Sequence, residues 1–396
     1  MAAHPSRRSV LGLLGMTPVA TLVAGPASAT TQGNRIPDGL RPGGQLDRFV
    51  ADRAARDEFA GSLLLTHRGR TVLARSHGMA DRERAVPNGP DTAFGLASVT
   101  KLFTAVAVAQ LAQQGKVAHR ERVGTYLAGF PDAIAGATVH HLLTHTSGLG
   151  DYHGLPGYFD EAATWTSPEQ VMAGTTGFIR RSAPLFAPGA GWAYSNSGYH
   201  LLGEIVAAAS GMSYYDYVRR HVFAAAGMTR TDFVAKPQRR TDPRIAHPYY
   251  RDAQGRWADG VEELEFVGTP AGDAFATCAD MDRFARHLYQ ERLLAPGHTR
   301  LVLSGKVLPG EPTPPPGQTP PPQDGPRAEA VYQCYGPIGS LVGGQWIFEH
   351  GGGNTFGEST FVQFYPETDW VLVVLSNYAD AAVAVARLAR GLIVGS

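Results

Sequence analysis

Hydrophobic spacing near the start of the chain predicts a helix followed by two strands. Residues 45–59 carry apolar side chains at helical spacing, and we expect this helix to end before Gly61. The segment 62–81, SLLLTHRGRTVLARSHGMAD, predicts two strands around a turn at Arg68-Gly69. This part of the chain is therefore expected to supply one helix and one strand pair.

The end of the chain repeats this arrangement in the opposite order. Residues 345–349 predict a strand, and the apolar runs TFVQFY (360–365) and WVLVVLSN (370–377) predict a hairpin of buried strands. The last segment, 381–395, has the apolar spacing of an amphipathic helix.

Between these ends the pattern is mostly helical, with loops rich in Gly and Pro. Two clear helices are predicted at 199–209 and 279–288. We therefore expect an α/β (α+β) fold, in which both ends build one antiparallel sheet flanked by the terminal helices. Residues 40–110 and 265–396 would form this sheet region, with 111–264 as an inserted, mostly helical region.

Two further segments have compositions that set them apart. Residues 1–29 combine a twin-arginine pattern (SRRSVL), an apolar stretch and an Ala-Ser-Ala cleavage site, which predicts an export signal and a secreted protein. Residues 309–326 are rich in proline and predict a surface loop.

Charge and composition exclude several classes of partner. The net charge is zero, so no basic footprint indicates nucleic acid, and no later apolar run is long enough for a membrane span. We expect a small-molecule or peptide substrate. Two cysteines, Cys278 and Cys334, are too few for a thiolate metal site. The sequence leaves open whether they form a disulfide or stay as buried thiols.

Candidate chemistry begins with Ser98 and Lys101, which stand three residues apart at the start of an apolar run. On a helix such a pair shares one face. Apolar neighbours would desolvate the lysine, lower its pKa and supply a neutral amine as a base. Lysine is also scarce, with four among 35 basic residues. The alternative interpretation is a helix cap beside a surface lysine.

Two other short segments contain candidate site residues. Tyr194-Ser195-Asn196 lies in a Gly-rich loop before a predicted helix, where Tyr194 could relay a proton and Asn196 could bind an amide. Taken alone, Asn196 as a helix N-cap explains this segment equally well. His350 precedes three glycines that would let the backbone approach a ligand closely, or would form a flexible turn.

The order S-x-x-K, Y-x-N, H-G-G resembles the serine β-lactamase and penicillin-binding protein superfamily. Within it, the chain is similar to the branch of class C β-lactamases, D-Ala-D-Ala carboxypeptidases, D-aminopeptidases and β-lactamase-fold esterases. The likeness covers about residues 45–393, with the further segments LLTHTSGL (142–149), PGAGWAYSNSGYHLLGEIV (188–206) and FVQFYPETDWVLVVLSN (361–377).

The resemblance implies a role for each motif residue. Ser98 would be the nucleophile that forms an acyl-enzyme, and Lys101 would take its proton. Tyr194 would pass a proton to the leaving group, and Asn196 would hold the acyl-side amide. His350 would line the opposite wall of the site.

The resemblance also implies how the backbone takes part. Gly352 and Gly353 would contact substrate, and the N–H groups of Ser98 and Gly353 would form an oxyanion hole. No cofactor motif is present, and His141 and His145 are interpreted as loop residues rather than metal ligands.

The third motif departs from the β-lactamase pattern of Lys-Thr-Gly or Lys-Ser-Gly. His350 is only partly charged at an ordinary pKa of about 6.5, and Gly351 offers no hydroxyl, so a substrate carboxylate would be held weakly. We therefore expect an exported serine hydrolase, D-alanyl-D-alanine carboxypeptidase-like or acting on a carboxylic ester. The alternatives are a β-lactamase or a non-catalytic protein that binds penicillin or cell wall.

Overall fold

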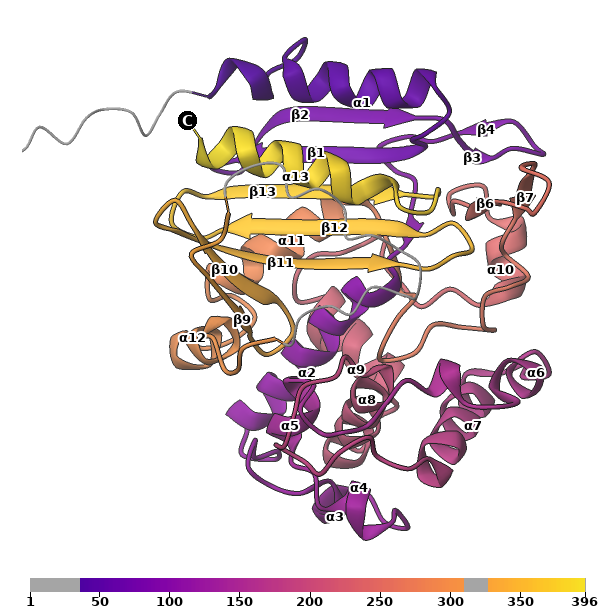
Figure 1. The fold of residues 1–396 in the computed structure, drawn as a ribbon, viewed down its shortest axis with the longest axis vertical. Helices are drawn as coiled ribbons and strands as arrows, with labels where there is room; N and C mark the ends of the chain where they lie inside the picture. The colour runs from indigo at the N-terminus through magenta and orange to yellow at the C-terminus, as the bar shows by residue number, and fades with distance from the viewer. Residues whose placement is uncertain (1–35, 310–326, 396) are drawn as a thin grey trace, which may run out of the picture. The chain divides into compact units, whose positions relative to one another are not determined.

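Both ends of the chain build one antiparallel sheet in the computed structural model, which describes residues 36–309 and 327–395 (Figure 1). The predicted signal and residues 310–326 of the predicted proline-rich loop lie outside these residues. The sheet has seven strands in the order β2-β1-β13-β12-β11-β10-β9. Their bounds are Arg70–His77 (β2), Gly61–His67 (β1), Trp370–Ser376 (β13), Ser359–Tyr365 (β12), Gln345–Gly353 (β11), Ile338–Val342 (β10) and Ala330–Gln333 (β9).

Helices cover both faces of this sheet. Helices α1 (Gln45–Ala55) and α13 (Ala381–Val394) lie over one face, and α11 (Cys278–Tyr289) packs on the other (Figure 1). Strand β13 shows why its sequence is apolar throughout. Leu372 and Val374 belong to the core under α1 and α13, whereas Val371 and Val373 belong to the core on the α11 side. A strand buried on both faces gives a continuous apolar run.

The middle of the chain is helical, as predicted. Helix α2 (Lys101–Gln113) is buried along almost its whole length and packs against α8 (Asn196–Ser210). Helix α8 ends at Gly211, whose φ of 72° is the left-handed conformation that favours glycine at a helix C-terminus. The other helices are α3 (Val123–Tyr126), α4 (Asp132–Ala135), α5 (Val139–Leu143), α6 (Tyr158–Ala162), α7 (Pro168–Arg181), α9 (Tyr214–Val218), α10 (Lys236–Thr241) and α12 (Pro296–Leu303).

Short two-stranded pairs complete the described fold: β3 (Met79–Asp81) with β4 (Val86–Pro87), β5 (Phe94–Gly95) with β8 (Phe275–Ala276), and β6 (Tyr249–Arg251) with β7 (Trp257–Asp259). From Ile36 onward the chain clusters as one compact unit, so the predicted sheet and helical regions are parts of a single unit. The predicted fold class is confirmed.

The structure also shows the state of the two cysteines. Cys278 and Cys334 are free and buried, so the thiol alternative is correct and there is no disulfide between them. Among the described residues, no helix combines the length and the hydropathy that a membrane crossing requires.

Candidate active site

Ser98 lies in a tight 3-10 turn, Ala97–Thr100, that leads directly into α2. Ala97 has a φ of 43°, an unusual conformation for a residue with a side chain. Hydrogen bonds hold the turn from two sides: Asp273 N donates to Ala97 O at 3.1 Å, and Thr360 Oγ1 donates to Leu96 O at 2.9 Å. The serine is thus fixed between β12 and the segment that precedes β8.

Lys101 is completely buried, and its ammonium nitrogen reaches three oxygen atoms. Nζ lies 3.0 Å from Ser98 Oγ, 2.7 Å from Asn196 Oδ1 and 2.6 Å from the Ala271 carbonyl oxygen. Burial lowers the pKa of Lys101 to about 7, although the negative charge of Asp151 opposes this shift. The lysine is therefore partly neutral near pH 7.

The three contacts determine what a neutral Lys101 can do. A neutral amine has two N–H donors and one lone pair. Asn196 Oδ1 and Ala271 O can only accept hydrogen bonds, so they take the two donors. The lone pair then faces the Ser98 hydroxyl, which can donate its proton. This geometry suits proton transfer from Ser98 to Lys101.

Tyr194 lies over the same lysine. Its ring centroid is 4.8 Å from Lys101 Nζ, and its hydroxyl is hydrogen-bonded to Ser98. Burial of the hydroxyl raises the pKa of Tyr194 above its usual value, so the phenol keeps its proton at neutral pH. The side chain is 40% exposed, which leaves it open to a bound molecule. Tyr194 can therefore donate a proton or a hydrogen bond beside Ser98.

Asn196 is the first residue of α8 and not its N-cap. Ser195 caps this helix, because its hydroxyl accepts from Gly198 N at 2.9 Å. Asn196 Nδ2 donates to Asp151 Oδ2 at 2.9 Å. A carboxylate only accepts, so this contact fixes the amide with Oδ1 toward Lys101. Asp151 is a site residue that the sequence did not predict.

Asp151 is itself part of a charged network. His153 Nδ1 lies 3.2 Å from Asp151 Oδ1, and its Nε2 lies 3.1 Å from Glu265 Oε1. Burial alone would lower the pKa of His153, but its hydrogen bonds to both carboxylates raise it to about 10. His153 is consequently an imidazolium at neutral pH.

The third motif lies in β11 rather than in a flexible turn. His350 is 8% exposed, and its Nδ1 donates to Gly351 O at 2.7 Å. Burial, together with the positive charge of Lys101, lowers the pKa of His350 to about 4. The sequence predicted a partly charged histidine. The structure gives a neutral one, because burial disfavours the charged form.

Gly352 explains why this strand passes so close to the nucleophile. A Cβ atom at this position would lie 2.9 Å from Ser98 N and 2.7 Å from Thr360 Oγ1. Neither atom can move freely, since both belong to the turn contacts that hold Ser98. Only glycine therefore allows β11 to approach the turn at this point.

Two cavities meet at Ser98 and Gly353. The polar cavity, of about 310 Å³, also includes Asn196. Its charged lining residues are Asp151, His153, Glu263, Glu265 and Asp273. The apolar cavity, of about 750 Å³, also includes His350. Its aliphatic and aromatic lining residues are Trp192, Tyr194, Val331, Ile338, Phe361 and Val383. The serine thus separates a charged side from an apolar side.

The remaining candidate histidines have structural contacts. His145 Nδ1 accepts a hydrogen bond from Ser195 N at 3.1 Å, which positions the loop that carries Tyr194. His141 forms a reciprocal capping box with Thr138 at the start of α5. His145 thus lies in a loop, as the sequence predicted, whereas His141 lies within helix α5.

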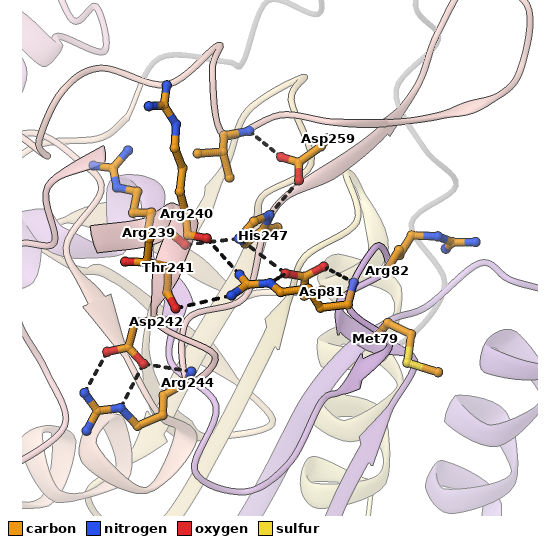
Figure 2. Close-up of polar contacts among 12 residues, drawn as sticks. Met79, Asp81, Arg82, Arg239, Arg240, Thr241, Asp242, Arg244, His247 and Asp259 are labelled. Atoms are coloured by element: carbon orange, nitrogen blue, oxygen red, sulfur yellow. Dashed lines mark hydrogen bonds and ion pairs between the residues drawn. The ribbon is translucent and has the colours of Figure 1, made fainter. Parts of the chain in front are cut away.

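A third cavity, of about 560 Å³, holds a separate polar cluster (Figure 2). His247 lies between Asp259 and the Arg239 backbone: Nδ1 donates to Asp259 Oδ2 at 2.6 Å and Nε2 donates to Arg239 O at 3.0 Å. Asp81, nearby, is paired with Arg84. Because both partners of His247 only accept, it carries two protons and its pKa is raised, against the opposing effect of burial. These charges pair with one another, which indicates a structural role.

Comparisons with known proteins identify the family of this chain. The family model described as Beta-lactamase matches residues 46–394. Penicillin-binding protein 4* of Bacillus subtilis (strain 168) is 32% identical over 262 residues, 61% of this chain and 54% of the relative. Esterase EstB of Burkholderia gladioli is 37% identical over 229 residues, 54% of this chain and 57% of the relative. The chain thus spans little more than half the length of these curated relatives.

Solved structures show the same fold. The crystal structure of a penicillin-binding protein from Bacillus halodurans superimposes with a TM-score of 0.73 and 26% identity. The likeness covers 86% of this chain and 99% of that structure. The family match over 46–394, with the order of motifs around Ser98, shows that the chain belongs to the Beta-lactamase family.

Proposed function

We propose that the chain is a serine hydrolase in which Ser98 attacks a carbonyl and forms an acyl-enzyme. Neutral Lys101 takes the hydroxyl proton, because its lone pair faces Ser98 Oγ at 3.0 Å. Tyr194 passes a proton to the leaving group, which then departs into the apolar cavity that Tyr194 lines. Asn196 holds the acyl part of the substrate at the edge of the polar cavity.

The backbone stabilises the oxyanion in this proposal. The N–H groups of Ser98 and Gly353 supply the two hydrogen bonds, and the close approach of Gly352 to the turn brings them together. Removal of one such donor costs an enzyme about 2.7–4 kcal/mol of transition-state stabilisation.

The charge state of His350 and the lining of its cavity indicate the class of substrate. In the apolar cavity the described lining residues include no lysine or arginine, and His350 is neutral. The acidic lining residue, Glu349, accepts a hydrogen bond from Gln363 at 2.7 Å. A leaving group with a carboxylate would lose its hydration there without gaining a cation. A D-Ala-D-Ala peptide or a β-lactam carries such a carboxylate, whereas a carboxylic ester need not.

We therefore favour a carboxylic ester as the substrate class. The similarity to a relative named as an esterase supports this choice. D-alanyl-D-alanine carboxypeptidase activity is the second candidate, supported by the similarity to penicillin-binding proteins. The described lining of the apolar cavity, which includes no lysine or arginine, is the observation that places the ester first.

Relative turnover tests this order. We expect p-nitrophenyl butyrate to be hydrolysed with a higher kcat/KM than diacetyl-Lys-D-Ala-D-Ala or the β-lactam nitrocefin. Ser98→Ala should abolish all turnover, while Ser304→Ala, a change at an exposed serine, should leave it intact. Faster turnover of the peptide would reverse the order of the two candidates.

A fluorescent penicillin tests the non-catalytic alternative. Covalent labelling that disappears in Ser98→Ala, without turnover of ester, peptide or β-lactam, would identify a penicillin-binding protein that no longer hydrolyses substrate. Turnover of any of the three excludes this alternative.

We further propose that the protein is exported through its twin-arginine signal at 1–29. Replacement of both Arg7 and Arg8 by Lys should retain the protein inside the cell. Export of this variant at the normal level would contradict the proposal.

A further inference from the structure

His350 presents a free ring nitrogen to the apolar cavity. The residue is 8% exposed and lines this cavity together with Ser98 and Tyr194. Its Nδ1 is used by the 2.7 Å contact with Gly351 O. No hydrogen bond joins Nε2 to a residue that the structure describes.

The contact with Gly351 decides which nitrogen carries the proton. A carbonyl oxygen can only accept, so Nδ1 must be the protonated nitrogen of a neutral ring. Nε2 then has a lone pair and no hydrogen. The cavity wall beside Ser98 therefore offers a hydrogen-bond acceptor at the position where the β-lactamase pattern has a lysine ammonium.

An acceptor and an ammonium select opposite partners. The lone pair of Nε2 repels a carboxylate but binds a hydroxyl hydrogen. On this wall Trp192, Ile338 and Phe361 present aromatic and aliphatic surface, and the carboxylate of Glu349 already accepts a hydrogen bond from Gln363 at 2.7 Å. A leaving group with its own hydroxyl would satisfy Nε2, whereas an ether oxygen at the same place would leave it unpaired.

We propose that His350 is a specificity-determining residue that selects esters whose leaving alcohol carries a second hydroxyl group, that is, monoesters of diols and polyols. The inference rests on the proposed ester hydrolysis and on departure of the leaving group through the apolar cavity. In the complex, the second hydroxyl donates to His350 Nε2 while Tyr194 protonates the departing oxygen.

Three butyrate esters with the same acyl group test the proposal. 2-Hydroxyethyl butyrate offers a donor, 2-methoxyethyl butyrate offers only acceptors, and carboxymethyl butyrate carries a carboxylate. We expect kcat/KM for the hydroxyethyl ester to exceed that of the methoxyethyl ester by roughly 2- to 13-fold, the range for one net hydrogen bond. The carboxymethyl ester should be the poorest of the three.

Two variants assign the preference to His350. His350→Phe should make the hydroxyethyl and methoxyethyl esters equal, because it removes the acceptor and keeps an aromatic ring. His350→Lys should make the carboxymethyl ester the best of the three. The matched control His287→Phe changes a histidine on α11, whose Nδ1 bonds Arg283 O, and should keep the wild-type ratio.

The outcomes separate this inference from the proposed function. Equal rates for the three esters in the wild type would overturn the role of His350 and leave ester hydrolysis standing. An unchanged ratio in His350→Phe would also overturn it. No hydrolysis of any ester would overturn the proposed ester substrate class, and the inference with it. The ratio in the wild type alone decides the matter if a variant fails to fold.

Discussion

The two cavities that meet at Ser98 are lined by two histidines with opposite charge states, the half-buried His153 on the polar side and the buried His350 on the apolar side. In the polar cavity the carboxylates of Asp151 and Glu265 hold the pKa of His153 at about 10, against the effect of burial. In the apolar cavity burial lowers the pKa of His350 to about 4, and no carboxylate opposes the shift. The pKa values of the two histidines differ because His153 has carboxylate partners and His350 has none among the described residues.

This contrast separates two tasks within one site. On the polar side, His153 pairs with Asp151 and Glu265, and Asp151 fixes the amide of Asn196 that in turn contacts Lys101. On the apolar side, a neutral ring leaves one nitrogen free for a ligand. In the proposed mechanism, charge orients the catalytic groups on one side of the site, and the absence of charge sets the leaving-group preference on the other.

The largest effect on the rate of acylation is expected at Lys101, beside Ser98, where the polar and apolar cavities meet. Lys101→Met should lower the acylation rate by roughly 10²–10⁴-fold, the typical contribution of a general base. The measurement is single-turnover release of p-nitrophenolate from an ester. Lys116→Met, on the exposed surface, is the matched control and should react normally. A normal rate in Lys101→Met would show that another group takes the proton.

A smaller effect is expected at Gly352. Gly352→Ala places a methyl group 2.9 Å from Ser98 N, so the strand must move away from the turn. We expect kcat to fall by about 10²–10³-fold, as for the loss of one oxyanion donor. Gly297→Ala, with open space around its Cβ, should have no effect on kcat. An active Gly352→Ala enzyme would contradict the geometry proposed for the oxyanion hole.

Asp151→Asn tests the charged side. The wild-type kcat/KM should rise with pH through about 7, as Lys101 loses its proton. The Asp151 charge raises the pKa of Lys101, so its removal should move this rise to lower pH. We also expect kcat/KM at its plateau to fall by roughly tenfold, because Asn196 then donates to a neutral amide oxygen and this hydrogen bond is weaker than one to a carboxylate. Asp160→Asn, a change at an exposed residue of α6, should leave the pH dependence of kcat/KM unchanged. An unmoved profile in Asp151→Asn would make Asp151 a structural residue only.

The smallest effect is the pH dependence of stability, where the two histidines act in different windows. The folded pKa of His153 is raised, so its stabilising contribution is present below the unfolded value of about 6.5 and is lost as pH rises through about 10. The folded pKa of His350 is lowered, so stability falls as pH drops from about 6.5 to about 4. Urea unfolding should show a weaker alkaline loss in His153→Gln and a weaker acid loss in His350→Gln. If each variant loses stability with pH as steeply as the wild type does, the charge states given for His153 and His350 are contradicted.

The sequence predicted those parts of the site that depend on local spacing. Ser98 and Lys101 are three residues apart, and the apolar neighbours of Lys101 indicated its burial, which the structure shows to be complete. Asp151 was missed because its role depends on its place beside Asn196, 45 residues further on. The Ala271 carbonyl was missed because a backbone acceptor leaves no signal in the residue type.

Prediction of the strands from the sequence was limited in a similar way. The sheet and its terminal helices were predicted from apolar runs, but β11 was expected to end at residue 349. It continues to Gly353, because pairing of Gly351–Gly353 with Ser359–Phe361 on β12 satisfies a backbone that glycine would otherwise leave irregular. The charge of His350 follows from the same burial, which its neighbours in sequence do not indicate.

Covalent modification by a fluorophosphonate tests the central claim most directly, since this reagent forms a stable adduct with an activated serine. Mass spectrometry of the labelled protein should show one adduct, located on Ser98 and absent from Ser98→Ala and from Lys101→Met. An adduct on another residue, or undiminished labelling of Ser98→Ala, would contradict the account.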